Sequence, residues 1–174
     1  GGRLYCSPHN AASVLVVDPA TGTLSFLQHP SLLEGGMKYL GISAGPNGKL
    51  YCSPCHAASV LVVSPSMGTL SFLEHPELKE GGGKYRGIVA SPDGRLYCGP
   101  LNAAAVLVVD PSMSTLSFMQ HDGLEEGGMK YSGIAAGPDG KLYCSPNHAA
   151  SVLVLDPALG RIQDAASGSQ MAAS

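Results

Sequence analysis

The sequence predicts an all-β fold made of four similar units, and three observations support this prediction. The pair Tyr-Cys recurs at residues 5–6, 51–52, 97–98 and 143–144, a spacing of 46 residues. Residues 2–47 and 48–93 differ at only 14 of 46 positions. Each unit contains four short strand-like runs separated by turn residues, and no stretch has helical periodicity. Four strands per repeat of this length favour a β-propeller-like array of about four blades, one per unit.

The turns separate the strands in a regular way. Asn47-Gly48, Asp93-Gly94 and Asp139-Gly140 predict type I′ hairpins between the first and second strands, because both turn positions tolerate a positive φ. The run Asp18-Pro19-Ala20-Thr21-Gly22 predicts a type I turn that joins the third strand to the fourth. The long segment from His29 to Lys38 is expected to cross from the outer edge of one blade to the inner edge of the next.

The third strand of each unit is predicted to be buried on both faces. In the first unit it reads Val14-Leu15-Val16-Val17, which is apolar at consecutive positions. Blades that pack between neighbouring blades would bury such a strand; a β-solenoid is the alternative, although it does not need two tight hairpins per period. The leucines expected in blade cores are Leu15, Leu61, Leu107 and Leu153, and the tyrosines expected to open inner strands are Tyr39, Tyr85 and Tyr131.

The predicted organisation is one repeat region, 1–164, followed by a C-terminal tail, 165–174. The repeats are 2–47, 48–93, 94–139 and 140–164. Gly1-Gly2 aligns with Asn47-Gly48, so the first blade is expected to lack its inner strand. Ile162 and Asp164 replace Leu24 and Phe26, so the last outer strand is expected to be degraded. Damaged edges expose backbone hydrogen-bonding groups, which predicts an incomplete or open propeller, a homo-oligomer through its incomplete end blades, or a partner chain at these edges.

Composition excludes two classes of partner. The net charge of −3 disfavours nucleic acid, whose binding proteins carry a basic face. The longest apolar run, Ala103–Val109, is too short to span a membrane. We therefore expect a soluble chain that is not membrane-spanning.

One pair of segments carries a resemblance to known repeats. Gly133-Ile-Ala-Ala-Gly-Pro-Asp-Gly-Lys-Leu-Tyr-Cys-Ser-Pro, followed by Ser151-Val-Leu-Val-Leu-Asp-Pro, resembles the repeats of NHL, YVTN and streptogramin-lyase-like propellers. The resemblance is greater still to the tandem propeller repeats of dinoflagellate algae, and it covers residues 2 to about 160. It implies a propeller scaffold. Its enzymes, the streptogramin lyases and the calcium-dependent lactonases, use metal-binding acids and a catalytic His that have no clear counterpart in this sequence.

The recurring cysteines are expected to be buried in the second strands rather than bonded to one another. Cys6, Cys52, Cys98 and Cys144 occupy one position per unit, and Cys is among the most buried residue types. Cys52-Ser-Pro-Cys55 has redox spacing but no helix to lower a thiol pKa. Unpaired cysteines and the absence of glycosylation sequons favour an intracellular location, in the cytoplasm or an organelle such as a plastid.

No catalytic residue, metal site or cofactor is predicted. His29, His75 and His121, with carboxylates in the loops that follow, could support acid-base chemistry, but their repetition favours structural hydrogen bonding. The loop after each second strand is predicted to share one side of the array with the crossing loops, and that side is the predicted binding surface. Its candidate residues are His9, Asn10, Cys55, His56, Leu101, Asn102, Asn147, His148, His29, His75 and His121.

The predicted function is a non-catalytic binding or assembly module, a protein-protein interaction scaffold in a larger complex. Two alternatives remain open at this point: a metal-dependent enzyme of the lyase or lactonase type, and a binder of sugars or other small ligands in the central channel. The absence of Trp weakens the sugar-binding alternative.

Overall fold

The computed structural model describes residues 2–165, which form fifteen strands and one short 3-10 helix, η1 (Pro30–Leu32). The first sheet contains β1 (Leu4–Cys6), β2 (Ser13–Asp18) and β3 (Thr23–Gln28). The second contains β4 (Tyr39–Ala44), β5 (Leu50–Pro54), β6 (Ser59–Ser64) and β7 (Thr69–Glu74). The third contains β8 (Tyr85–Ala90), β9 (Leu96–Pro100), β10 (Ala105–Asp110) and β11 (Thr115–Gln120). The fourth contains β12 (Tyr131–Ala136), β13 (Leu142–Pro146), β14 (Leu153–Asp156) and β15 (Arg161–Asp164).

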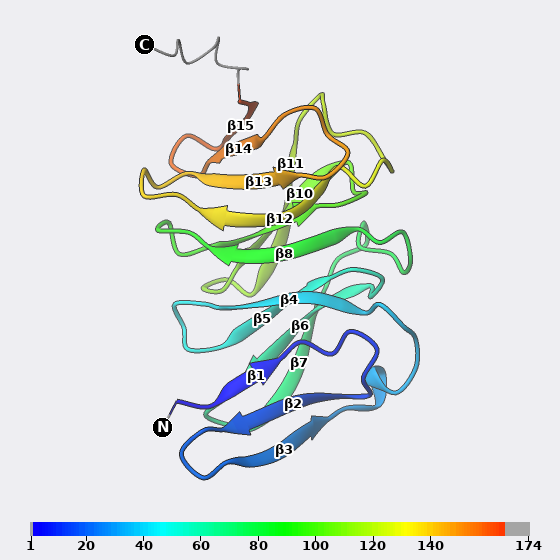
Figure 1. Cartoon of the computed structure of the whole chain (residues 1–174), viewed down its shortest axis with the longest axis vertical. Coiled ribbons are helices and arrows are strands. Elements are labelled where there is room, and N and C mark those ends of the chain that lie inside the picture. Colours follow the sequence, from blue (N-terminus) through cyan, green and yellow to red (C-terminus); the bar gives the residue numbers. More distant parts are fainter. Residues whose placement is uncertain (1, 166–174) are drawn as a thin grey trace, which may run out of the picture.

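The four antiparallel sheets follow one another as the blades of an open arc (Figure 1). Within each four-stranded sheet the strands pair in sequence order, from an inner strand (β4, β8 or β12) to an outer strand (β7, β11 or β15). The first sheet has only three strands, because β1 corresponds to the second strand of the other blades. The predicted all-β, open, propeller-like fold is therefore confirmed, including the missing inner strand of the first blade.

The hairpins between the first and second strands differ from the prediction of a type I′ turn. Among the described non-glycine residues only Met37, Ser114 and Met129 have a positive φ, so Asn47 does not. The Gly48 amide donates to the Gly45 carbonyl (3.2 Å), and Gly48 alone takes the left-handed conformation, at φ +74°. Pro46 fixes its own φ near −65°, which favours a type I turn followed by a left-handed glycine.

The core lies between the sheets, where each sheet packs against the next. Val60, Leu61 and Val63 are fully buried, so the third strand of the second blade has both faces covered, as predicted. Leu107 and Leu153 are also fully buried. Leu15 is only half-buried, and its predicted place in a blade core was wrong. Among the described residues no sheet covers the face of the first blade on which Leu15 lies, which explains why Leu15 is less buried than the other three leucines.

The two ends of the chain keep their strands to different extents. The last outer strand forms despite Ile162 and Asp164, and β15 pairs with β14 from Leu153↔Asp164 to Asp156↔Arg161. It spans four residues, whereas the outer strands of the other blades span six. The predicted tail, 165–174, lies outside the described residues except for Ala165, whose amide donates to the Val152 carbonyl (2.8 Å). No helix among the described residues is long and apolar enough to cross a membrane.

Candidate functional site

The structure brings the crossing loops and the loops after the second strands together in one layer, which we call the loop side. The Lys38 amide donates to the His9 carbonyl (2.8 Å), and the Cys55 amide donates to the Lys38 carbonyl (2.9 Å). The same pattern recurs at Lys84, between Cys55 and Leu101. Each crossing loop is therefore joined by backbone hydrogen bonds both to the blade that it leaves and to the blade that it enters.

Three lysines at these junctions have a structural role that the sequence did not lead us to predict. The amino groups of Lys38, Lys84 and Lys130 donate to the carbonyls of Gly35, Gly81 and Gly127, at 2.8, 2.9 and 2.9 Å. Burial lowers the pKa of Lys84 to about 8. Lysine side chains are rarely buried, so the residue type alone predicts exposure to solvent. The recurrence of a lysine at the same position of each repeat was the one feature of the sequence that could have indicated this structural role.

Two of the predicted binding residues hold the crossing loops in place. The Asn10 side-chain oxygen accepts from the Met37 amide (2.7 Å), and the Asn102 oxygen accepts from the Met129 amide (2.8 Å). Asn102 also donates through Nδ2 to the Gly82 carbonyl (2.9 Å) and thus joins two crossing loops. His56 occupies the equivalent position in the second blade and lies beside Gly83.

The recurring histidines have a structural role in the described part of the chain. The Nδ1 atoms of His29, His75 and His121 each accept a backbone N–H from two residues later, all at 3.2 Å. The rings of His29 and His75 pack on Phe72 and Phe118 of the following blade, with centroids 4.7 and 4.9 Å apart. This supports the structural reading of these residues over acid-base chemistry.

The loop side contains a cavity of about 1130 Å³ between the first two crossing loops. His56 and His75 line it together with Glu74, Glu80 and Phe72. Among the remaining predicted residues, Cys55 and Leu101 are buried, His9 is half-buried, and Asn147 and His148 are exposed. The geometry thus brings two of the predicted histidines into one cavity and leaves Asn147 and His148 open to solvent at the end of the arc.

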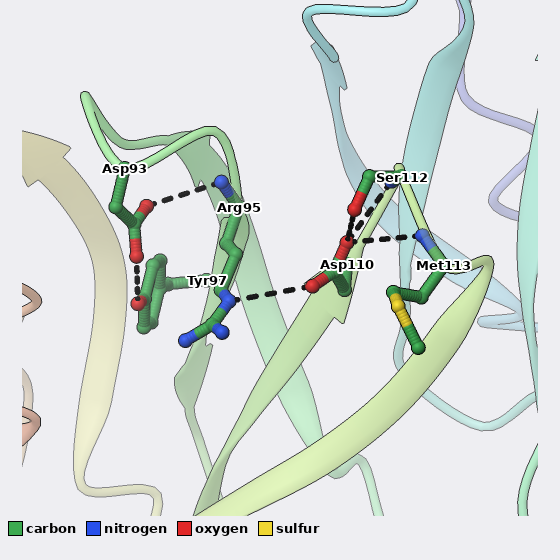
Figure 2. A network of polar contacts seen from close by, with 6 residues as sticks. All are labelled: Asp93, Arg95, Tyr97, Asp110, Ser112 and Met113. Atoms are coloured by element: carbon green, nitrogen blue, oxygen red, sulfur yellow. Dashed lines mark hydrogen bonds and ion pairs between the residues drawn. The ribbon is translucent and has the colours of Figure 1, made fainter.

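Polar contacts within and between hairpins lie on the side opposite the loop side, and Figure 2 shows those of the third blade. The Tyr97 hydroxyl donates to Asp93 (2.8 Å), and Arg95 pairs with Asp110 at 3.5 Å. Asp110 accepts from the amide and the hydroxyl of Ser112, at 2.9 and 2.6 Å. These hydrogen bonds lower the pKa of Asp110, with the Ser112 side chain as the largest cause. The hydrogen bonds of Asp93 and of Asp110 to Ser112 close turns, and the Arg95–Asp110 pair joins two hairpins.

The cysteines of the described residues are free thiols. Cys52, Cys98 and Cys144 are buried, and burial raises the pKa of each to about 12. Burial also raises the pKa of Cys55, which opposes the thiolate chemistry that a Cys-x-x-Cys pair would need. Within residues 2–165, no three His, Cys, Asp or Glu side chains are grouped so that they could hold a metal ion.

Comparisons with known proteins bear on the fold. Neither a protein-family model nor a curated protein sequence matches the chain. Among solved structures, virginiamycin B lyase from Staphylococcus aureus is similar, with a TM-score of 0.76 and 16% identity over 94% of this chain and 51% of the lyase. A streptogramin B lyase has a TM-score of 0.74 and 17% identity over 94% and 50% of the two chains. Hydrazine synthase of Kuenenia stuttgartiensis has a TM-score of 0.71 and 20% identity over 93% and 45%.

This chain spans about half the length of these neighbours. At such low sequence identity the likeness shows the fold alone and does not settle enzyme status. Together with the repeat and the strand order, it shows that the chain has a β-propeller-like fold, which the streptogramin and virginiamycin B lyases share.

Proposed function

We propose that this chain is a non-catalytic binding and assembly module that associates with other polypeptides. The observation that carries the proposal is the front face of the first sheet, defined by Leu4, Cys6, Leu15, Val17, Leu24 and Phe26. These residues are cross-strand neighbours on one face, and Leu4, Leu24 and Phe26 are 58%, 60% and 58% exposed. An apolar patch of this kind marks an interaction surface.

The other blades support a proposal for the partner of this face. In the second blade the equivalent residues Cys52, Leu61 and Val63 are buried against Val14 and Leu32, which precede them in the chain. The third and fourth blades repeat the arrangement, with Leu107 and Leu153 at the position of Leu61. The front face of the first sheet therefore has the chemistry of a blade-to-blade interface, and a second copy of the chain is its proposed partner.

The loop side is proposed as a second contact surface, through His56, His148 and the other candidate residues of the sequence prediction. Variable residues on loops of a rigid scaffold are well placed for recognition. We also propose an intracellular location, which the free cysteines support, and kinship with the dinoflagellate-type propeller repeats, which the repeated segments support.

A small-ligand binder, or an enzyme of the lyase or lactonase type, is the second candidate function. The loop-side cavity favours it, because His56, His75, Glu74 and Glu80 supply polar groups around a space of about 1130 Å³. A ligand in this cavity would be detected by calorimetric titration with His56→Ala as the comparison variant.

Sedimentation velocity over a concentration series tests the assembly function. We expect the wild-type chain to self-associate. Leu24→Glu or Phe26→Glu should raise the protein concentration at which self-association occurs by about tenfold or more, since a charge would be buried at the centre of the contact. Met67→Glu is the control, because Met67 is an exposed apolar residue in the β6–β7 hairpin, outside the front face. A chain that stays monomeric, or equal association of all variants, would contradict the proposal.

The loop-side contact needs a separate test. Partner capture by His56→Ala and His148→Ala should fall, whereas Asn47→Ala and Asp93→Ala, in the opposite hairpins, should retain it. Loss of partner capture only in the two hairpin variants would contradict the proposal, because it would place the contact on the side opposite the loop side.

A further inference from the structure

We propose that the loop-side cavity is a docking groove for an arginine-containing segment of another polypeptide. The groove lies between the first crossing loop, residues 29–38, and the second crossing loop, residues 75–84. All residues that line it fall between Pro30 and Gly81. The inference deepens the loop-side contact proposed above and rests on it for the choice of a polypeptide as ligand.

The first observation is the size of the groove and its apolar surface. Its volume of about 1130 Å³ exceeds the range of about 300–1,000 Å³ that is usual for small-molecule pockets. Leu33, Phe72 and Leu78 line it together with Pro30 and Pro76. Leu78 is buried, whereas Leu33 is 66% exposed. A space of this size, with apolar side chains in its wall, suits several residues of a polypeptide better than one small molecule.

The second observation is the charge of the groove. Glu34 belongs to the first crossing loop, Glu74 to the end of β7 and Glu80 to the second crossing loop, and all three are exposed. Lys38 is the one Lys or Arg residue among the described residues that line the groove, so carboxylates outnumber ammonium groups by three to one. A cationic ligand would complement this charge.

The three carboxylates are not held in ion pairs of the protein itself. Neither ion pair of the described residues involves them. The amino groups of Lys38 and Lys84 donate to the Gly35 and Gly81 carbonyls, at 2.8 and 2.9 Å. The charge of Glu80 raises the pKa of Lys84, but burial lowers that pKa by more. The carboxylates of the groove are therefore available to a ligand.

The third blade differs from the second at two positions of the groove. Where the second blade has His56 and Glu74, the third has Asn102 and Gln120. Asn102 hydrogen-bonds to both adjoining crossing loops and so bridges them. His56 lines the groove, and among the described residues its side chain forms no such bridge. The second blade thus has an additional carboxylate at a place where no side chain ties the two loops together.

Arginine is the basic residue that fits this lining best. Phe72 and Glu74 are two residues apart on β7, so both side chains lie on the same face of the strand. The aliphatic part of an arginine side chain packs on apolar groups, and its planar guanidinium matches a carboxylate with two parallel hydrogen bonds. One arginine can therefore contact the phenyl ring and the carboxylate together, while apolar residues beside it in the segment contact Leu33.

Fluorescence anisotropy with the full 174-residue chain tests this inference. The probe is a labelled peptide of alternating leucine and arginine, and the matched control peptide carries citrulline, a neutral isostere, in place of each arginine. We expect saturable binding of the arginine peptide, weaker at high salt, and binding of the citrulline peptide that is weaker by about tenfold or more. Equal binding of both peptides, or no binding, would overturn the inference. Equally tight binding of N-acetylarginine amide would also overturn it, because the groove would then be a small-cation site.

Protein variants locate the site. Glu74→Gln should weaken binding of the arginine peptide by about threefold or more, and glutamine already occupies this position in the first and third blades, which favours folding of the variant. Glu125→Gln is the matched control, because it makes the same change in charge at an exposed residue outside the groove. Equal losses in the two variants would show that the peptide responds to net charge, and would contradict the inference.

Two further variants separate this inference from the proposed function. Leu24→Glu should lose self-association and still bind the arginine peptide. Loss of partner capture in His56→Ala, without any binding of the arginine peptide to the wild-type chain, would leave the loop-side contact standing and overturn its proposed ligand.

Discussion

At the scale of single residues, the position of a leucine in the array decides its contribution to stability. Leu61 and Leu15 occupy the same place in their repeats, but Leu61 is fully buried and Leu15 is half-buried. Leu61→Ala should lower the free energy of unfolding by ~2–5 kcal/mol, since it leaves a cavity between two sheets. Leu15→Ala should have a clearly smaller effect. Urea unfolding measures both, and equal losses would show that the front face is covered in solution.

Ser114 has a backbone conformation that is unfavourable for a residue with a side chain. It has φ +53° at the turn position that Gly22, Gly68 and Gly160 occupy in the other blades, with φ between 59° and 67°. Non-glycine residues are strained in this region. Ser114→Gly should therefore raise the free energy of unfolding by ~0.5–1 kcal/mol. Ser112→Gly is the control, because Ser112 bonds to Asp110 through its hydroxyl and should lose stability; thermal unfolding compares the two variants.

At the scale of elements, the strands were predictable and the turns only in part. The apolar run of the third strand and the fixed period located all four strands of a blade, because burial between sheets leaves a continuous pattern in the sequence. The type of the first hairpin was not recognised, since Pro46 acts on the turn through its own φ while Asn47-Gly48 alone favours another geometry. The lysines of the crossing loops were also missed, because their burial depends on contacts between loops of different blades.

The crossing loops provide a prediction at this scale. Asn102 accepts from Met129 and donates to Gly82, so it connects two loops. Asn102→Ala should speed hydrogen exchange in residues 127–130 and lower the free energy of unfolding by ~0.5–1.5 kcal/mol, because the Met129 amide and the Gly82 carbonyl lose their hydrogen bonds to this side chain. His56→Ala is the matched control at the same repeat position, where no side-chain hydrogen bond forms to the crossing loop among the described residues. Equal exchange in the two variants would contradict the role of Asn102.

At the scale of the whole molecule, the alignment of Gly1-Gly2 with Asn47-Gly48 predicted the incomplete first blade of the array. It did not predict which residues of the array's surfaces stabilise the loops and which are exposed. The sequence predicted a missing inner strand, and the first sheet has three strands. It did not predict that the loop side would use Asn10 and Asn102 to hold the scaffold. Near-identical repeats carry the same residues at the ends and in the middle, so exposure at the ends depends on which neighbour is present.

The same repetition predicts how the whole molecule responds to alkaline pH. Burial raises the pKa of Cys52, Cys98 and Cys144 from 9.0 to about 12, and that of Tyr39 from 10.0 to about 12. The folded state therefore keeps protons that the unfolded chain releases. The stability that these groups contribute is fully present below about pH 9 and is lost as the pH rises towards 12. Lys84, whose pKa falls from 10.5 to about 8, acts in the opposite direction between those values, and the three thiols outweigh it.

Urea unfolding from about pH 8 to about pH 11 measures this loss as a falling midpoint. Cys98→Ala removes one of the raised groups and should make the fall shallower, even if the variant is less stable at every pH. Cys6→Ala is the matched control, because Cys6 holds the same repeat position and is exposed in the first sheet. Its midpoints should follow those of the unchanged chain. Parallel curves for all three proteins would show that the buried thiols do not control alkaline unfolding.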